Sequence, residues 1–560
     1  MVKMTLKSLD EIPLMAVSYE AMEWNKTGSW RHVRPVYVER VAACRRGCPA
    51  REPIPHYFAL AKEGKYIEAW KLIMEENPLP GVCGRVCYHP CEKNCNRKEF
   101  DEPIAIHLME RFIADQVYDY DYQLPIIEDK KKQKVALVGS GPAGLSCAYQ
   151  LARRGYKVTI YEAYSEPGGM LRIGIPPYRL PREIIDKEIG RILGLGIDLK
   201  VNMRLGKDIQ MTDLIEKYDA VFISIGAYKS RRMKIEGEDA KGVMPGLEFL
   251  RRVNSGEDVQ IGKRVAVIGG GNTAIDTART SLRKGADVTI YYRRSRVEMP
   301  AVAEEVEAAE QEGIKIEFLV LPVKVITENN YVKGMELIRM ELGELDASGR
   351  RTPVRIPDSN FMASVDSVFT ALGEEPDLEF IDKQHLEWGR LKVDDNQMTS
   401  IVKVYAAGDC ATNPLGTVVD AIAAGKKAAY AIHHNFGYKL PKIDLSDIVT
   451  FDKINAIYFN KASRIIQPQL DVEKRIKHFK EVNRGLSEDA AIKEVIRCFS
   501  CGLCTYCDNC YIFCPDNAVK KNKNTKGYTI DYDHCKGCGI CVIECPRASL
   551  SLIKEIETED

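Results

Sequence analysis

The pattern of apolar and polar positions changes character along the chain. Between about residues 134 and 435, short apolar runs of strand length alternate with segments of helical periodicity; the runs include KVALVG, KVTIYE, RVAVIG and DVTIYY. This alternation predicts an α/β region with parallel sheets. Residues 61–80, AKEGKYIEAWKLIMEENPLP, instead carry apolar residues at helical spacing and predict a helix that stops at Asn77-Pro78. Residues 441–497 are predicted to form a helical connector, with Ser487 as the N-cap of its last helix.

Two glycine-rich loops, GSGPAG at 139–144 and GGGNTA at 269–274, each lie between a predicted strand and a predicted helix. Glycines permit a tight turn and a close approach of a pyrophosphate, whose charge the helix N-terminus stabilises, so each loop predicts a dinucleotide site. Glu162 ends the next strand, 18 residues after the first loop, where an acid binds a ribose hydroxyl. The candidate residues of the first site are Gly139, Gly141, Pro142, Ala143, Gly144 and Glu162.

The second site lacks that acid. Alignment of VTIYE at 158–162 with VTIYY at 288–292 puts Tyr292 in the place of Glu162, followed by Arg293 and Arg294. Arginines in place of the acid favour a 2′-phosphate and hence NADPH over NADH; the alternative is a solvated basic strand end. The residues to mutate are Arg293, Arg294 and Arg296, and the loop candidates are Gly269, Gly271, Asn272 and Thr273. Two such folds in tandem predict FAD in the first and a nicotinamide in the second, so that hydride passes between stacked rings.

Cysteine is concentrated at the two ends of the chain. Six of the 18 cysteines lie between 44 and 95, ten lie between 498 and 545, and Cys147 and Cys410 stand alone between them. Their spacing is typical of metal ligands kept reduced rather than of secreted disulfides. With no apolar leader or long apolar run, we expect a cytoplasmic protein without membrane insertion. Charge is balanced, 80 basic against 80 acidic residues, and indicates no nucleic-acid partner.

The carboxyl-terminal cysteines form two C-x2-C-x2-C-x3-C-P runs, which predict a ferredoxin domain with two [4Fe–4S] clusters at 498–560. Zinc is the alternative, but zinc sites favour C-x2-C pairs separated by longer gaps. The fourth cysteine of each run normally crosses to the other cluster. The expected ligand sets are therefore Cys504, Cys507, Cys510 and Cys545, and Cys514, Cys535, Cys538 and Cys541. Cys498 and Cys501 remain unassigned by these runs.

Several stretches together resemble the small-subunit family of NADPH-dependent glutamate synthase, which includes the amino-terminal half of dihydropyrimidine dehydrogenase and the large subunit of NADH-dependent ferredoxin:NADP oxidoreductase. They are CRRGCPAREPIP at 44–55, NPLPGVCGRVCYHPCEKNC at 77–95, PIAIHLMERF at 103–112, GGMLRIGIPPYRLP at 168–181, GGGNTAID, YYRR and AAGDC. The resemblance covers about residues 40–435. It implies electron transfer between NADPH, FAD and two amino-terminal clusters.

The resemblance also implies ligands for those two clusters. One set is Cys48, Cys87, Cys91 and Glu110, with a surface position on a helix as the alternative for Glu110. The other set contains Cys44, Cys95 and a pair from an RCLxC motif, but residues 1–43 contain no cysteine. FKEVNRGLSEDAAIKEVIRCFSC at 479–501 resembles the missing segment, so we expect Cys498 and Cys501 to complete this set, within the chain or across a dimer. The alternative is that they are spare or alternative ligands of the neighbouring ferredoxin cluster.

The same family places Gly169, Met170 and Leu171 near the flavin. Residues 404–429 resemble the closing motif of two-dinucleotide flavoproteins, which implies that Gly408 and Asp409 hold the flavin ribityl chain. The expected fold is a tandem two-dinucleotide-binding flavoprotein with an amino-terminal helical iron–sulfur domain and a carboxyl-terminal α+β ferredoxin domain. Its expected segments are 1–130 (helical iron–sulfur), 131–245 and 366–440 (FAD), 246–365 (NADP), 441–497 (connector) and 498–560 (ferredoxin). Cys147 and Cys410 form no redox pair and are expected to be buried.

These observations predict an FAD- and iron–sulfur-dependent NAD(P)H:acceptor oxidoreductase with four [4Fe–4S] clusters. No substrate domain remains, so we expect a hetero-oligomer whose redox partner is a 2-oxoacid, aldehyde or formate oxidoreductase, a glutamate synthase large subunit or free ferredoxin. The alternatives are a glutamate synthase small subunit and a non-catalytic electron-wiring subunit with a vestigial nicotinamide site. Hydride transfer requires no acid or base from the protein, so no catalytic residue is assigned.

Overall fold

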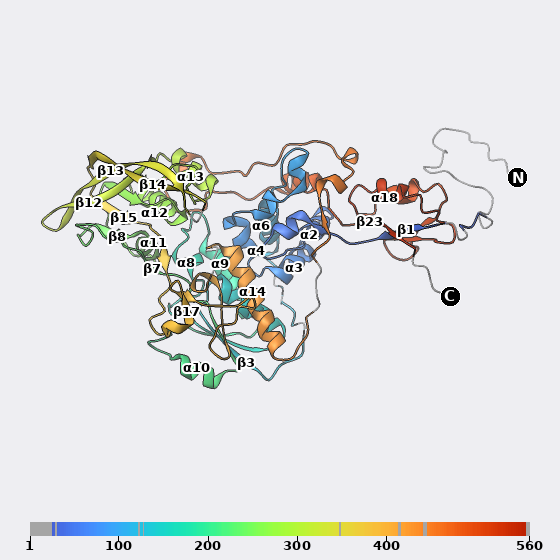
Figure 1. Cartoon of the computed structure of the whole chain (residues 1–560), viewed down its shortest axis with the longest axis horizontal. Helices are drawn as coiled ribbons and strands as arrows, with labels where there is room; N and C mark the ends of the chain where they lie inside the picture. Colours follow the sequence, from blue (N-terminus) through green and yellow to red (C-terminus); the bar gives the residue numbers. More distant parts are fainter. Residues whose placement is uncertain are drawn as a thin grey trace.

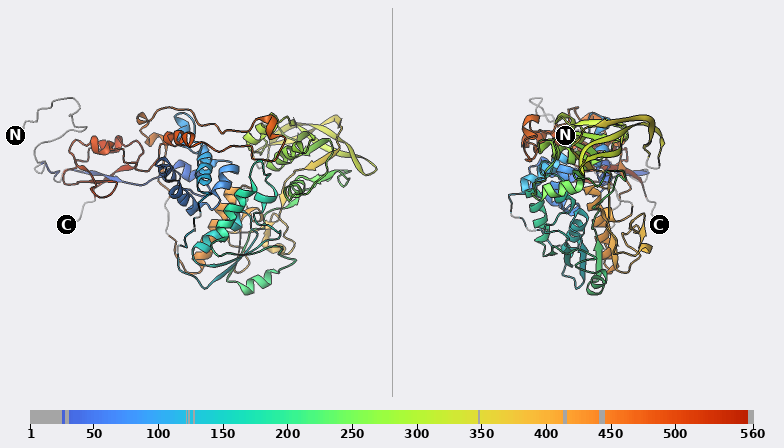
Figure 2. Two further views of the ribbon diagram at one scale, coloured as in Figure 1. Left: turned by 180° about the vertical axis from the view of Figure 1, so that it is seen from behind. Right: turned by 90° about the vertical axis from the view of Figure 1, so that its left-hand side faces the viewer.

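The computed structural model describes residues 25–27, 31–120, 122, 124–126, 128–346, 349–412, 416–440 and 445–555. The molecule is elongated, and the order of its parts along the long axis differs from their order in the sequence (Figure 1). The second dinucleotide unit lies at one end, the first lies below the centre, and amino-terminal helices occupy the middle. The cysteine-rich tail extends from the other end (Figures 1 and 2).

The first dinucleotide unit is a parallel five-stranded sheet in the order β19-β6-β3-β4-β5, as the alternating apolar runs predict. Its strands are β3 (Lys134–Val138), β4 (Lys157–Tyr161), β5 (Asp198–Lys200), β6 (Ala220–Ile223) and β19 (Val404–Ala406). Its helices are α7 (Pro142–Arg153), α8 (Met170–Ile173), α9 (Arg182–Leu193), α10 (Met211–Lys217), η5 (Gly408–Cys410) and α14 (Val418–Asn435). The central strands are buried because helices pack on both faces.

The second unit is also a parallel five-stranded sheet, in the order β11-β10-β9-β15-β8. Its elements are β8 (Val243–Pro245), α11 (Gly246–Asn254), β9 (Arg264–Ile268), α12 (Asn272–Arg283), β10 (Asp287–Tyr292), α13 (Ala303–Gln311), β11 (Lys315–Phe318) and β15 (Ser367–Thr370). An antiparallel sheet of β12 (Val320–Glu328), β13 (Tyr331–Leu345) and β14 (Arg351–Ala363) is attached to it. Because β8 and β15 pair in the parallel sheet, this unit extends beyond the expected segment 246–365 at both ends.

Short pairings finish the dinucleotide region. Two antiparallel pairs are formed by β7 (Lys229–Ser230) with β16 (Glu374–Glu375), and by β17 (Leu386–Glu387) with β18 (Arg390–Leu391), next to η4 (Lys383–His385). The strands β7 and β16 lie on the two chain crossings between the units. They therefore tie the two dinucleotide units together at the point where the chain passes between them.

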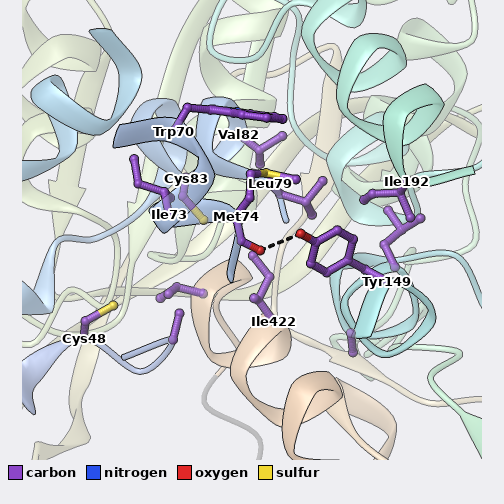
Figure 3. Packing of buried hydrophobic residues seen from close by; sticks show 14 of the residues in the cluster. Cys48, Trp70, Ile73, Met74, Leu79, Val82, Cys83, Tyr149, Ile192 and Ile422 are labelled. Atoms are coloured by element: carbon purple, nitrogen blue, oxygen red, sulfur yellow. Dashed lines mark hydrogen bonds between the residues drawn. The ribbon is translucent and has the colours of Figure 1, made fainter. Parts of the chain in front are cut away.

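The amino-terminal region is helical, as predicted. It contains α1 (Ala43–Gly47), α2 (Ile54–Lys62), α3 (Tyr66–Glu76), α4 (Pro80–Val86), α5 (Pro90–Lys93), η3 (Asn96–Glu99) and α6 (Ile106–Val117). Helix α3 ends immediately before Asn77-Pro78, where the sequence predicts its end. The core of this region continues into the first dinucleotide unit, where the Tyr149 hydroxyl of α7 donates to the Met74 carbonyl at 2.7 Å (Figure 3). The helical region and the first dinucleotide unit therefore share one apolar core.

The connector differs from the predicted helical segment. Its described part contains β20 (Ile448–Val449), η6 (Phe451–Lys453), η7 (Ala456–Tyr458), α15 (Val472–Arg475) and α16 (Glu488–Arg497), and most other residues are extended or irregular. Its backbone hydrogen bonds reach partners that are distant in sequence: Arg464 N donates to Glu102 at 2.8 Å, and Leu470 N donates to the Val482 carbonyl at 3.0 Å. Helix α16 begins as predicted, because Ser487 Oγ accepts from Ala490 N at 3.3 Å. Tertiary partners for the backbone thus replace the helical hydrogen bonds that we expected.

The tail is built from two distant parts of the chain. Residues after 500 form α17 (Asn509–Ile512), β21 (Val519–Lys521), β22 (Tyr528–Ile530), α18 (Ile540–Ile543) and β23 (Leu550–Lys554). Strand β1 (Val33–Tyr37) pairs antiparallel with β23, and β2 (Val41–Ala42) pairs parallel with β20. The tail therefore includes an amino-terminal strand that the expected segment 498–560 omits. No helix in the described ranges is both long and apolar enough to cross a membrane.

Candidate functional site

The first glycine loop has the backbone that a pyrophosphate site requires. Gly139 has a φ of +99°, and a Cβ there would lie 2.5 Å from the Ser224 carbonyl oxygen. A Cβ on Gly144 would lie 2.0 Å from the Gly139 oxygen, so the start of α7 packs tightly against the loop. A Cβ on Gly141 would meet nothing within 4 Å, which leaves the backbone open for a phosphate at the N-terminus of α7.

Glu162 lies beside this loop, as predicted. Its Oε2 accepts from Ser140 N at 2.9 Å and its Oε1 accepts from Tyr164 N at 2.9 Å. Together with Gly139 and Gly141 it lines a cavity of about 360 Å³. A carboxylate held next to an open glycine loop, in a cavity of this size, suits the adenosine half of FAD.

The two flavin-side motifs also meet the first loop. A Cβ on Gly169 would lie 2.9 Å from Gly141 Cα, and Met170 and Leu171 follow it as the start of α8. A Cβ on Gly408 would lie 3.5 Å from Ala143 Cβ. Burial raises the pKa of Asp409, against the opposite effect of Arg390. The four segments that carry the expected FAD residues therefore converge on one place.

The second glycine loop repeats this geometry. Gly269 has a φ of +146°, and a Cβ on Gly271 would meet nothing within 4 Å. A Cβ on Gly270 would lie 2.5 Å from the ring of Tyr292, so this ring fills the position of the missing acid. Asn272 Oδ1 accepts from Val302 N at 3.0 Å. Burial raises the pKa of Glu374, against the opposite effect of Thr273.

The three candidate arginines of the second site differ in exposure and in whether other groups of the protein bind their guanidinium. Arg293 is exposed at the end of β10. Arg294 is buried, and its guanidinium is hydrogen-bonded to Asp346 Oδ2 at 2.6 Å and to the Arg351 carbonyl at 2.7 Å. Arg296 is exposed and pairs with Glu310 at 2.6 Å. The guanidinium of Arg294 is therefore occupied within the protein, whereas that of Arg293 is exposed to solvent.

One cavity of about 920 Å³ joins three of these regions. Its lining includes Asn272 of the second glycine loop, Thr417 at the N-terminus of α14, and the cluster-motif residues Cys87, Tyr88 and His89. The Tyr88 hydroxyl also donates to Asp420 Oδ2 of α14 at 3.3 Å. The second dinucleotide unit, the first dinucleotide unit and a cysteine motif thus border a common space.

The structure brings Cys48, Cys87, Cys91 and Glu110 together. The carboxylate of Glu110 raises the pKa of the Cys48 and Cys87 thiols, although burial is the larger cause for both. Glu110 is 5% exposed, so the alternative of a surface position on the helix is wrong. Three thiols and a carboxylate in one buried pocket are a donor set that fits a [4Fe–4S] cluster.

A second carboxylate in this pocket was not predicted. Asn77 Nδ2 donates to Glu52 Oε1 and to Glu110 Oε1, at 2.9 Å in both cases. Burial raises the pKa of Glu52 to about 7. The only sequence signal for Glu52 is its position four residues after Cys48, within the motif CRRGCPAREPIP.

Cys44, Cys95, Cys498 and Cys501 also form one group. Burial raises the pKa of the Cys44 thiol, and the thiols of the other three raise it further. Backbone pairing holds the two chain segments together, because Arg40 N donates to the Gly502 carbonyl at 3.3 Å. The four thiols lie within a single chain, which fits a [4Fe–4S] cluster that needs no dimer.

The tail cysteines divide into the two expected crossed sets. One small cavity is lined by Cys504, Cys507, Cys510 and Cys545, and a second is lined by Cys514, Cys535, Cys538 and Cys541. Four thiols around each cavity provide the full ligand set of a cubane cluster. Cys147 and Cys410 are buried, as expected, and lie on α7 and η5.

His89, Glu92 and His107 form a further polar group that sequence patterns did not indicate. The two imidazole rings stack with centroids 3.7 Å apart, and His107 Nδ1 lies 2.7 Å from Glu92 Oε1. Arg464 of the connector binds the other carboxylate oxygen at 2.5 Å. Glu92 is therefore fully engaged by the protein, and the group fastens the connector to the motif that carries Cys87 and Cys91.

Three family patterns match the chain. The pyridine nucleotide-disulphide oxidoreductase family matches residues 133–425, dihydropyrimidine dehydrogenase domain II with its 4Fe-4S cluster matches residues 37–122, and a 4Fe-4S binding domain matches residues 528–551. These matches cover the two dinucleotide units, the amino-terminal helices and the second half of the tail. The first match contains both glycine-rich loops, and the other two contain cysteines of the expected ligand sets.

Curated relatives match across most of the chain. The NADPH-Fe(3+) oxidoreductase subunit beta of Geobacter sulfurreducens is 40% identical over 517 residues, which covers 84% of this chain and 77% of that one. The NADP(+)-dependent formate dehydrogenase subunit beta of Moorella thermoacetica is 41% identical and covers 82% and 70%. The glutamate synthase small chain of Escherichia coli is 38% identical and covers 70% and 87%. The chain therefore belongs to the glutamate synthase small-chain-like family of NAD(P)H-dependent flavin and iron–sulfur oxidoreductases.

Proposed function

We propose that this chain is the nicotinamide-oxidising or nicotinamide-reducing subunit of a larger complex, with four [4Fe–4S] clusters between its flavin and its partner. The observation that carries the proposal is the cavity of about 920 Å³ that is bordered by Asn272, Thr417 and Cys87. It puts the second dinucleotide loop, the flavin unit and a cluster motif around one space. Bound FAD would supply the conversion between hydride transfer and single-electron transfer.

The residues of the chain bind and orient the groups that react. The open backbone at Gly141 and Gly271 receives the two pyrophosphates, and Glu162 binds a ribose. Arg293 attracts a 2′-phosphate, which supports NADP(H) over NAD(H). Tyr88 spans from the cluster motif to α14 through its hydrogen bond to Asp420. The side of the cavity that carries Thr417 is thus linked directly to the residue after Cys87.

The four proposed ligand sets lie in order from the flavin cavity to the tail. The set of Cys48, Cys87, Cys91 and Glu110 lies nearest the flavin cavity, because Cys87 lines it. The set of Cys44, Cys95, Cys498 and Cys501 links the helical region to the tail, which holds the two crossed sets. The last two steps adjoin at Arg547, because its carbonyl accepts from Gly502 N at 2.7 Å, next to Cys501, and the residue lines the cavity of the Cys504 set. This order supports a path from the flavin unit to the outer end of the tail.

The partner is proposed from chemistry and from the names of relatives. Two of these are named as beta subunits, of an NADPH-Fe(3+) oxidoreductase and of a formate dehydrogenase. The described chain offers no second substrate domain beyond the dinucleotide units and cysteine regions. We therefore propose a partner subunit with its own redox centre, of the formate, aldehyde or 2-oxoacid oxidoreductase class.

Anaerobic addition of NADPH to the purified full-length chain tests the proposal. The flavin absorbance near ~450 nm should bleach and EPR signals of reduced clusters should follow. If neither NADPH nor NADH bleaches the flavin, the oxidoreductase proposal is wrong. That result supports the alternative, an electron-wiring subunit without a working nicotinamide site. Gentle native purification should recover a redox partner; recovery of the chain alone, with full turnover toward free ferredoxin, contradicts the subunit assignment.

A further inference from the structure

The two halves of the tail have the same backbone but different side chains at equivalent positions. Cys514 and Cys545 are the last cysteines of the two runs. Four residues later, Ala518 N donates to Cys514 Sγ at 3.2 Å and Ser549 N donates to Cys545 Sγ at 3.4 Å. Ser549 also places its hydroxyl oxygen 3.2 Å from Cys545 Sγ. Ala518 has no hydroxyl. Of these two equivalent positions, only that of Ser549 therefore offers a hydroxyl to the cysteine sulfur four residues before it.

A second hydroxyl reaches the same ligand set from the amino-terminal strand. The Tyr37 oxygen lies 3.2 Å from Cys510 Sγ, across 473 positions of sequence. Its ring is stacked on Tyr528, with centroids 6.1 Å apart and planes 19° apart. An iron-bound thiolate carries no proton, so the hydroxyl is the donor in this contact. Strand β1 therefore completes the tail and also supplies a hydrogen bond to a cluster ligand.

Cationic side chains lie near both ligand sets. Arg547 lines the cavity of the first set, whereas Lys536 lines the cavity of the second and Arg31, which is paired with Glu555, lowers the pKa of Cys535. Across the ranges that the structure describes, no side-chain hydroxyl is hydrogen-bonded to a sulfur of Cys514, Cys535, Cys538 or Cys541. Charge therefore does not favour the first set, and the hydroxyls of Tyr37 and Ser549 are hydrogen-bond donors that the second set lacks.

Hydrogen bonds to the sulfurs help to set the reduction potential of an iron–sulfur cluster. A donor stabilises the reduced cluster more than the oxidised one, because the reduced cluster carries one more negative charge. We propose that Tyr37 and Ser549 make the cluster of Cys504, Cys507, Cys510 and Cys545 the higher-potential cluster of the tail. This inference rests on the proposed function, in which the tail holds two [4Fe–4S] clusters. Both residues act through cluster ligands and are positioning residues.

The proposed difference in reduction potential determines which tail cluster holds an electron first. This higher-potential cluster is the one beside the helical region, because Arg547 lines its cavity and the Arg547 carbonyl accepts from Gly502 N at 2.7 Å, next to Cys501. An electron that leaves the body of the protein would settle there before it moves to the outer cluster. Strand β1 would influence this step through the hydroxyl of Tyr37.

Redox titration of the full-length chain, followed by EPR, tests the inference. Tyr37→Phe removes only the hydroxyl, and Ser549→Ala removes the other. Each should lower the midpoint potential of the same tail cluster and leave the second cluster unchanged. Loss of one neutral hydrogen bond should shift the electron-sharing equilibrium about fivefold, which is ~40 mV at ~59 mV per tenfold change for one electron. Ala518→Ser should raise the potential of the other cluster.

Tyr532→Phe is the matched control, because the Tyr532 hydroxyl donates at 2.8 Å to the Pro35 carbonyl of the same strand β1 and not to sulfur. It should leave both potentials unchanged. If Tyr37→Phe and Ser549→Ala retain both clusters and neither potential moves, the inference is wrong. If the wild-type chain shows no tail clusters by iron content and EPR, the proposed function itself fails. The two failures are therefore distinguishable in the same samples.

Discussion

The side-chain amide of Asn96 donates to the sulfur of Cys501 at 3.5 Å, although 405 positions separate the two residues. Asn96 directly follows Cys95, so this contact joins the last cysteine of the amino-terminal motif to the first cysteine pair before the tail. Asn96 Nδ2 also donates to the Val449 carbonyl at 2.8 Å, which adds the connector to the same junction. Cys498 and Cys501 thus face the helical region and not the neighbouring ferredoxin set.

Replacement of both Cys498 and Cys501 by serine tests this shared ligand set. If these cysteines complete the set of Cys44 and Cys95, the double variant should lose one of four clusters, or about a quarter of the iron. The EPR signals of the two tail clusters should remain, because their eight ligands are untouched. Iron analysis and EPR of the dithionite-reduced protein provide the measurement.

Cys410→Ser is a suitable control for that experiment. Cys410 is buried, and its sulfur lies 3.4 Å from the Ala407 carbonyl, which a serine hydroxyl can also use. This variant should keep all of its iron. Unchanged iron in the Cys498 and Cys501 double variant would show that these thiols are spare.

Local sequence patterns predicted the elements whose signals are local. The two glycine loops, the end of α3 before Asn77 and the N-cap at Ser487 each depend on residues within a few positions, and the structure contains all three. The connector was predicted wrongly because its backbone hydrogen bonds go to distant partners such as Glu102. Helical propensity contains no information on those partners.

Contacts between distant segments explain the other omissions. Strand β1 pairs with β23, and nothing in VRPVY indicates this partner. Arg294 is adjacent to Arg293 and has the same chemistry, but its side chain is directed to Asp346 within the protein. The crossed cysteine sets could be predicted because the fourth ligand of a ferredoxin run follows a known rule. The extra carboxylate Glu52 could not, since a single acid near a cysteine motif has no distinctive spacing.

Arg293→Ala should weaken NADPH binding selectively. A charge-assisted hydrogen bond to a phosphate contributes about 1.5–3 kcal/mol, so the KM for NADPH should rise roughly 10- to 100-fold. The KM for NADH should change little, because NADH has no 2′-phosphate. Steady-state reduction of a dye with each nucleotide measures both values.

Arg296→Ala is the control for the nucleotide experiment. Arg296 is also exposed and close in sequence, but it is paired with Glu310. Its loss should leave the ratio of the two KM values unchanged. An Arg293→Ala variant with the same ratio as wild type would contradict the assignment of Arg293 to the phosphate.

Glu110→Ala should remove a ligand from the cluster nearest the flavin cavity. A glutamine keeps one side-chain oxygen at this position, so Glu110→Gln should retain the cluster with an altered EPR signal, whereas Glu110→Ala should lose it or convert it. Glu52→Gln is matched in burial and keeps a polar partner for Asn77. It should retain the full iron content. Full iron and an unchanged EPR spectrum in Glu110→Ala would exclude ligation by Glu110.

Glu312 should give the second dinucleotide unit an acid-sensitive stability. Its carboxylate accepts from Arg279 at 2.7 Å and from Arg283 at 2.8 Å, and Arg475 of the connector lies 3.4 Å away. Burial alone would raise the pKa of Glu312, but the hydrogen bonds from Arg283 and Arg279 outweigh burial and lower it to about 2. A depressed folded-state pKa stabilises the protein above the unfolded value of 4.5, and this stabilisation is lost as the pH falls towards 2.

Glu312→Gln should therefore destabilise the protein by roughly 3 kcal/mol near neutral pH, because two buried arginines lose their counter-charge. The difference from wild type should shrink between pH 4.5 and pH 3, since wild-type Glu312 begins to lose the same interaction there. Thermal unfolding at several pH values measures the difference. Glu310→Gln removes an exposed pair with Arg296 and should cost less than about 1 kcal/mol at every pH. A Glu312→Gln difference that stays constant down to pH 3 would show that the buried arginines do not depend on this charge.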